Sequence, residues 1–139
     1  MADADRLLGF LIPARNARGR VVRLGPVLGE ILAAHAYAET PARLLSQALA
    51  LAALMGAMLR PDEGQVTVQA QPAQTRDDSG GPIQLLVADY LNGALRGYVA
   101  VDPDRRIAPD LDLQQLFGDG RLVITLDQTA SAERYQGIV

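Results

Sequence analysis

The segment Ile83–Val101, with the sequence IQLLVADYLNGALRGYVAV, decides the fold because it holds two apolar runs joined by Asn92-Gly93. This dipeptide readily adopts positive φ, which the two-residue turns of β-hairpins require. The runs on either side, 83–91 and 94–101, have the length and the content of Val, Ile and Tyr that strands favour. We therefore predict an antiparallel hairpin.

Further strands are expected on both sides of this hairpin. Residues 65–71 alternate strictly between apolar and polar side chains, so they predict a strand with one solvated face. The polar, glycine-containing stretch 72–82 predicts a loop between this strand and the hairpin. Other segments with strand character lie at 6–12, 17–24, 121–127 and 134–139, and a short helix or turn is expected at 111–117.

Two helices are expected between the second strand and residue 65. Gly25-Pro26 opens the first, whose apolar side chains follow helical spacing as far as His35. Thr40-Pro41 opens the second, as an N-cap hydroxyl followed by proline, and that helix should run to Leu59. Beyond Gln47 it is apolar all round, which is typical of a buried helix. The alternative is an adaptable surface that binds other proteins, made by Leu54, Met55, Met58 and Leu59.

This order of elements predicts an α+β fold, in which a mixed, largely antiparallel β-sheet carries two main helices packed on one face. The strands that follow Pro82 are apolar on both of their faces. The helices can cover one face of such a sheet, and no other element is expected to cover the second. We therefore expect a dimer partner, a missing segment or another bound protein to cover it.

Composition limits the class of protein. The 139 residues suit one globular domain, with 49% hydrophobic and 21% charged residues. A net charge of -3 disfavours nucleic-acid binding, and the absence of cysteine excludes disulfides and thiolate-bound metals. The acidic start, Met1–Arg6, lacks the basic region of a signal peptide, and the longest apolar run, Ala48–Leu59, is too short to span a membrane. We expect a cytoplasmic protein without membrane contact.

No catalytic constellation is visible in the sequence. The single histidine, His35, has no paired carboxylate or cysteine, so a packing role is favoured over a ligand or a base. The serines lie outside any nucleophile elbow, and Gly118-Asp119-Gly120 leads into a strand, so it predicts a tight turn. The serines are Ser46, Ser79 and Ser131.

Two charged clusters have open alternatives. The densest basic cluster consists of Arg15, Arg18, Arg20 and Arg23, of which Arg18 and Arg20 share one face of the second strand. A solvated strand face is favoured, with binding of an anion or an acidic partner as the alternative. A group of aspartates lacks the spacing of a calcium loop, so solvated-loop and helix-cap roles are favoured. These are Asp102, Asp104, Asp110 and Asp112.

The end of the chain carries a resemblance to a known family. Residues Gly118–Val139 read GDGRLVITLDQTASAERYQGIV, and the string ERYQGIV after the GDGRLVITLD segment closely resembles the redox-regulated holdase chaperones of the thirty-three-kilodalton heat-shock protein family. The resemblance is to the substrate-binding domain of that family. Weaker matches in the same order support it, at Ala17–Val22, at Ile31–Tyr37 and at Gly81–Val99.

The resemblance implies an ATP-independent chaperone that is not an enzyme and that acts as a homodimer. It also implies a C-terminal module whose four cysteines hold zinc until oxidation releases the metal and uncovers apolar surface. This sequence has no cysteine, so we expect no cofactor and no metal in it. Residues 1–139 are expected to be the N-terminal client-binding and dimerisation domain of a truncated chain, with the C-terminal zinc-binding redox-switch domain absent.

The expected binding surface is one apolar face of the sheet. We predict that it binds unfolded or partly folded proteins, with the opposite set of side chains as the alternative, since the sequence does not decide which face packs on the helices. A constitutive dimerisation domain without client binding is the other hypothesis. The candidate residues are Leu85, Val87, Val99, Val101, Leu122 and Ile124.

Overall fold

A computed structural model describes residues 5–72, 80–128 and 133–139. The first two strands, β1 (Arg6–Ile12) and β2 (Ala17–Arg23), form a separate two-stranded sheet. The short 3-10 helix η1 (Pro13–Arg15) connects them. A five-stranded sheet and three α-helices make up the rest of the described residues, together with their connections. They are α1 (Pro26–Ala33), α2 (Glu39–Gly56), β3 (Gly64–Gln71), β4 (Ile83–Leu91), β5 (Ala94–Val101), α3 (Leu113–Phe117), β6 (Arg121–Gln128) and β7 (Glu133–Ile138).

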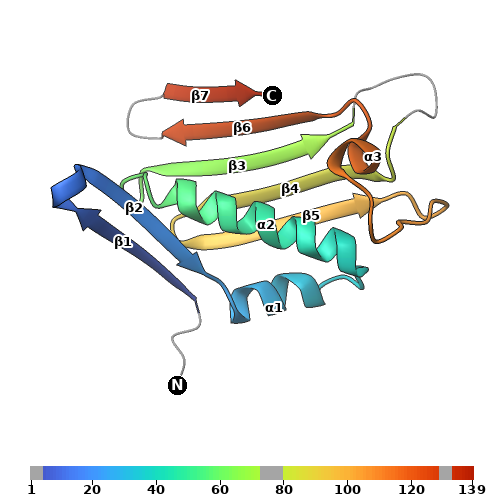
Figure 1. The fold of residues 1–139 in the computed structure, drawn as a ribbon, viewed down its shortest axis with the longest axis horizontal. Helices are drawn as coiled ribbons and strands as arrows, with labels where there is room; N and C mark the ends of the chain where they lie inside the picture. Colours follow the sequence, from blue (N-terminus) through green and yellow to red (C-terminus); the bar gives the residue numbers. More distant parts are fainter. Residues whose placement is uncertain (1–4, 73–79, 129–132) are drawn as a thin grey trace.

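The larger sheet has the strand order β5-β4-β3-β6-β7, and all of its neighbouring strands are antiparallel. Helix α2 lies across one face of this sheet, and α1 lies beside β5 (Figure 1). We call this face the helix side and the other face the open side. The predicted α+β fold with two main helices on one face is confirmed. None of the described helices is both long and apolar enough to cross a membrane.

The predicted hairpin is confirmed as β4 and β5, with the predicted bounds. Its turn residues have φ of 50° at Asn92 and 79° at Gly93. Both values lie in the left-handed region, which glycine and asparagine tolerate better than other residues. The dipeptide therefore fixes the register of the two strands, and with it which side chains of β4 and β5 share a face.

The core lies between α2 and the strands β3, β4 and β5. Leu45 and Leu49 of α2 are fully buried against the sheet. A Cβ added to Gly97 of β5 would lie 2.9 Å from Leu45 Cδ1 and 3.1 Å from Leu49 Cδ2. The missing side chain of Gly97 therefore lets the helix approach the sheet closely, which explains why a strand interior contains this glycine.

Helix α2 differs from its prediction at both ends. It begins at Glu39 after an N-cap at Ala38 that makes no side-chain cap, so the predicted N-cap at Thr40 is wrong. Thr40 and Pro41 lie in the first turn, where the missing N–H of proline costs no helical hydrogen bond. The helix ends at Gly56 rather than Leu59, because the backbone then tightens into a turn in which Leu59 N–H donates to the Gly56 carbonyl.

Candidate functional site

The six candidate residues do not share one face, so that expectation is wrong. Side chains alternate along a strand, and the register assigns Leu85 and Val87 to the open side. The other four lie on the helix side, and they are Val99, Val101, Leu122 and Ile124. The alternation within each strand is confirmed, but the sequence does not show which positions of different strands are opposite each other. A register shift between Ile83 and Leu85 makes the pairing still harder to predict, because it offsets the start of β4 against β5.

The four candidates on the helix side have different surroundings. Val99 is only 2% exposed and belongs to the core under α2. Val101, Leu122 and Ile124 are partly buried against the edge of that core. Among the described elements α2 packs chiefly on β3, β4 and β5, so the apolar side chains of β6 have no helix over them.

The open side carries a polar row that crosses all five strands. Its members are cross-strand neighbours, in the order Gln136, Thr125, Thr67, Asp89 and Arg96. Asp89 accepts hydrogen bonds from Thr67 Oγ1 at 2.5 Å and from Arg96 Nε at 2.8 Å. Gln136 Nε2 donates to Thr125 Oγ1 at 3.3 Å. The prediction that the second face is bare apolar surface is therefore wrong along this row.

Apolar side chains on the open side are divided into small groups. On one side of the polar row, Val87 neighbours Tyr98 of β5, and Val123 neighbours Ile138 of β7. Gln69 lies between these two pairs in the same cross-strand row. A polar side chain in the middle of the row separates the apolar pairs, so the larger continuous apolar surface must be sought on the helix side.

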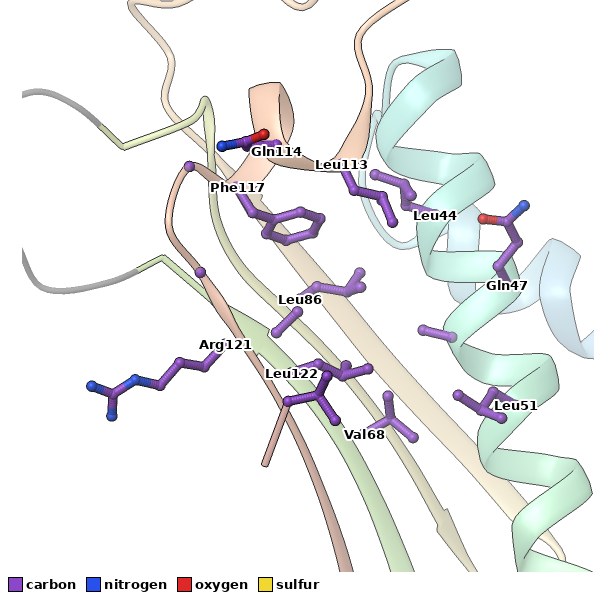
Figure 2. Close-up of a pocket in the computed structure, with 15 residues that line it drawn as sticks. Leu44, Gln47, Leu51, Val68, Leu86, Leu113, Gln114, Phe117, Arg121 and Leu122 are labelled. Carbon is purple, nitrogen blue, oxygen red and sulfur yellow. The ribbon is translucent and has the colours of Figure 1, made fainter. Parts of the chain in front are cut away.

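On the helix side, a groove of about 440 Å³ lies between α2, α3 and β6. Its floor is formed by buried apolar side chains of the core, including Val68 and Leu86. Figure 2 shows Leu51 entering from α2 and Leu113 and Phe117 from α3, while Arg121 points away from the groove. The remaining lining residues are Leu44, Gln47, Ala48, Ala70, Gln114, Gly118, Gly120, Leu122 and Val139.

The groove exists because α2 has more apolar surface than the sheet beneath it covers. Leu44, Ala48 and Leu51 recur at helical spacing and line the groove from one flank of the helix. Since α2 packs on β3, β4 and β5, this flank faces β6 across the groove. Leu51 is consequently 37% exposed, although it lies in the middle of the most buried helix of the fold.

One end of the groove is closed by α3. Asp112 caps this helix with a complete capping box, in which its side chain accepts from Gln115 N–H and the Gln115 side chain accepts from Asp112 N–H. The cap fixes the direction of a helix of only five residues, which buries Phe117 and leaves Leu113 64% exposed at the groove. The helix-cap role predicted for Asp112 is confirmed.

The other sequence candidates lie outside the groove. His35 follows the end of α1 rather than lying on it, is exposed, and has ring contacts with Tyr37 and Tyr98 at 5.4 and 5.0 Å between centroids. Ser46 Oγ donates to the Ala42 carbonyl within α2. Gly118–Gly120 forms the predicted turn, whereas Ser79 and Ser131 lie outside the described residues.

The described residues offer no site for zinc. The sequence has no cysteine and a single histidine, and no group of three or more His, Asp or Glu in the described ranges is placed to hold a metal ion. Zinc in proteins takes cysteine, histidine and carboxylate ligands, usually four of them in a structural site. The described residues therefore lack the set of ligands that the zinc site implied by the family resemblance requires.

Comparison with known proteins decides the family. Residues 5–139 match the family described as Hsp33 protein. The chain belongs to this family. It is 41% identical over 140 residues to the 33 kDa chaperonin of Caulobacter vibrioides (strain NA1000 / CB15N). The matched region covers 96% of this chain and 44% of that relative. It is 39% identical to the 33 kDa chaperonin of Shewanella loihica over 97% of this chain and 44% of the relative.

A third relative, the 33 kDa chaperonin of Pseudomonas fluorescens (strain SBW25), is 35% identical over all of this chain and 43% of its own length. The chain thus spans less than half the length of these curated Hsp33-family relatives. The resemblance found in the ERYQGIV string is confirmed as membership of the family.

Sequence reasoning missed the groove residues that α2 and α3 contribute to this Hsp33-family domain, chiefly Leu44, Leu51 and Leu113. A signal for the first two was present, because the helix is apolar on more sides than a single sheet contact can bury. That pattern predicts a helix buried on most of its sides and does not show which flank stays open. No comparable pattern in the sequence indicates the direction of α3.

Proposed function

We propose that this domain binds unfolding proteins in the helix-side groove, without ATP and without catalysing a reaction. The observation that supports the proposal most strongly is the exposed apolar lining contributed by three separate elements, with Leu51, Leu113 and Leu122 at its walls. The relatives that carry the name 33 kDa chaperonin agree with a chaperone function. A cytoplasmic location stays a prediction from the sequence.

The chemistry of the groove suits clients that share no sequence. Burial of apolar area is worth roughly 25 cal/mol per Å², so a client segment that covers a few hundred Å² gains several kcal/mol before the costs of association. Such contacts are non-directional, and they select exposed apolar side chains rather than a defined motif. Polar groups at the rim, such as Gln47 and Gln114, limit the width of the apolar surface.

The apolar surface continues beyond the groove along β6. Leu122, Ile124 and Leu126 follow one another on the helix side of this strand, and Tyr135 of β7 is the cross-strand neighbour of Leu126. Tyr135 is exposed and the three β6 side chains are partly buried. We propose that an extended client segment lies along this row after entering the groove. Among the original candidates, Leu122 and Ile124 keep a proposed client-binding role.

Redox control is proposed only for a longer protein that contains the zinc module. The family resemblance implies that oxidation and zinc release activate such a protein, and no residue described here takes part in that step. In this account the groove is intrinsic to residues 5–139, so its client binding needs no oxidant.

The proposal is tested by light scattering from a model client that aggregates on heating. We expect the chain to suppress aggregation without ATP or oxidant, and we expect Leu51→Gln to weaken suppression at least ~5-fold, because it removes an apolar wall of the groove. Glutamine keeps a high helix propensity, so α2 should persist. The matched control is Leu91→Gln, since Leu91 is 41% exposed but lies on the open side.

A folded chain that suppresses no aggregation contradicts the proposal. Equal loss of suppression in Leu51→Gln and Leu91→Gln contradicts the assignment to the groove. Circular dichroism and thermal unfolding of each variant show whether the fold survives the substitution.

A second candidate function, self-association, is favoured by a different observation. All seven residues of β1 are exposed, and six large apolar side chains in this strand pair are at least 39% exposed. They are Leu7, Leu8, Phe10, Leu11, Ile12 and Val21. We propose that this domain forms a homodimer.

A further inference from the structure

The two edges of the five-stranded sheet differ in how they are covered. Strand β5 forms one edge, and α1 lies beside it (Figure 1). The Val99 N–H on this edge donates to the Tyr37 hydroxyl oxygen at 3.4 Å. Strand β7 forms the other edge, and among the described residues no strand pairs with its outer side. An uncovered edge of this kind is a template on which another extended chain can pair.

The outer side of β7 offers a regular set of backbone hydrogen-bonding groups. Leu122 and Val139 exchange two hydrogen bonds of 2.9 Å, so the backbone groups of Val139 point toward β6. Because these directions alternate along an antiparallel pair, the N–H and C=O groups of Arg134, Gln136 and Ile138 point away from β6. An extended peptide backbone matches this spacing of donors and acceptors, so the edge is suited to a peptide strand rather than to one particular sequence.

One face of this edge continues the apolar surface of the groove. Tyr135, Gly137 and Val139 lie on the helix side of β7, and Val139 also lines the groove. Tyr135 is 54% exposed and Val139 is 88% exposed. No atom lies within 4 Å of a Cβ built on Gly137, so the space between the two larger side chains is open. An apolar side chain of an added strand can occupy that space.

The other face of the edge is mainly polar. Arg134 and Gln136 lie on the open side of β7, followed by Ile138. Arg134 Nη2 donates to Asp127 Oδ2 at 2.9 Å, and the Gln136 side chain donates to Thr125 Oγ1. An added strand therefore meets apolar side chains on one face and mostly polar side chains on the other. Such an edge favours a segment in which apolar and polar residues alternate, which is the pattern of strands from half-buried antiparallel sheets.

We propose that an unfolding client adds an extended, amphipathic segment to the outer side of β7 as a further antiparallel strand. The proposal rests on the client binding proposed above and names the conformation that a client takes at this edge. An antiparallel direction is expected because every neighbouring pair in the sheet is antiparallel. The apolar side chains of the added segment lie on the helix side, where the edge meets the groove at Val139.

The test uses a fluorescein-labelled peptide of about eight residues in which valine and threonine alternate, a length within the range of ordinary strands. Fluorescence anisotropy measures its binding to the chain. Gln136→Pro removes one outward N–H and keeps the bonds between β7 and β6, and we expect it to weaken binding at least ~10-fold. The matched control is Gln136→Ala, which also loses the glutamine side chain but keeps the N–H, and it should bind within about 2-fold of the wild type.

A second comparison changes the peptide and leaves the protein unaltered. In antiparallel pairing, the threonines share the open side with Gln136 and turn their N–H groups toward β7, whereas the valine N–H groups point away. N-methylation of the threonines should therefore abolish binding, and N-methylation of the valines should preserve it. The two methylated peptides have the same composition, and they decide the outcome even where Gln136→Pro disturbs the fold.

Equal binding of the two methylated peptides overturns the proposal, and so does a loss confined to the valine-methylated peptide. A folded wild-type chain that binds no peptide overturns it too, and a dimer that dissociates in Gln136→Pro would then assign the edge to a second copy. Failure of the proposed function is a separate result, because it is measured as aggregation of a whole client protein. Loss of peptide binding with suppression of aggregation intact would reject only the added strand.

Discussion

Arg96 Nε lies 2.8 Å from Asp89 Oδ2, across β5 and β4 on the side of the sheet that no described helix covers. Asp89 is largely buried, with a side chain 12% exposed, whereas the Arg96 side chain is 75% exposed. An apolar client that covered this face would remove the exposed Arg96 guanidinium from water, and burial of a charged group is costly. This pair is a second reason, besides the apolar lining of the groove, for assigning client binding to the helix side.

Asp89→Ala should destabilise the fold without altering client binding. It removes hydrogen bonds from Thr67 and Arg96 to a charged acceptor, and we expect a loss of about 1–2 kcal/mol after allowance for solvent screening. Chemical denaturation measures this loss. Arg96→Ala should cost less, because the arginine is exposed and Thr67 still donates to Asp89. Equal losses in the two variants would show that the salt bridge alone accounts for the effect.

Gly97→Ala should destabilise the contact between α2 and β5. The added methyl group would lie 2.9 Å from Leu45 Cδ1 and 3.0 Å from the Val87 carbonyl oxygen, so side chains must shift, and we expect a cost of about 1–3 kcal/mol. Gly137→Ala is the matched control in another strand of the sheet, because no atom lies within 4 Å of its Cβ position. A neutral Gly97→Ala would mean that α2 packs less closely than described.

Asp5→Ala should loosen the junction between the start of β1 and the start of α1. It removes the acceptor for two backbone N–H groups at the start of the helix, and we expect a loss of about 1 kcal/mol, as for a helix cap. Asp5→Asn retains one carbonyl oxygen and should lose less. Hydrogen exchange at Gly25 and Val27 reports the change locally, and unaltered protection there would contradict the contact.

Tyr135 should ionise at higher pH than an ordinary tyrosine. Its hydroxyl donates to Glu133 Oε2 at 2.7 Å, and this hydrogen bond, together with the negative charge of Glu133, raises the pKa of Tyr135 above 10.0. The contact therefore stabilises the fold at pH below the ordinary tyrosine pKa, and that contribution is lost as pH rises through the raised value. Ultraviolet titration of the wild type against Glu133→Gln should show one tyrosine shifting to lower pH in the variant. Identical curves would contradict the hydrogen bond.

Most of the fold could be predicted because its elements have local signals. The Asn92-Gly93 turn, the alternation in 65–71 and the proline at the start of α1 each depend on neighbouring residues alone. The start of α2 was misplaced because Thr40-Pro41 resembles a cap and its proline, while the first turn of a helix also accepts proline.

The site was harder to predict because it depends on contacts between distant residues. The alternation of side chains correctly predicts that Leu85 and Leu86 lie on opposite faces of the sheet. Only the pairing of β3 with both β4 and β6 shows that Leu122 shares a face with Leu86. The groove also requires the direction of α2 across the sheet, which leaves β6 uncovered. No local pattern carries that information.

Site-specific photocrosslinking shows whether unfolding clients contact the helix-side groove. A photoreactive phenylalanine analogue is placed at position 51 in the groove or at position 91 on the open side, and each chain is irradiated with a heat-unfolding client. We predict strong crosslinking from position 51 and little from position 91, since only Leu51 lines the groove. Strong crosslinking from position 91 with none from position 51 would show that clients bind the open side instead.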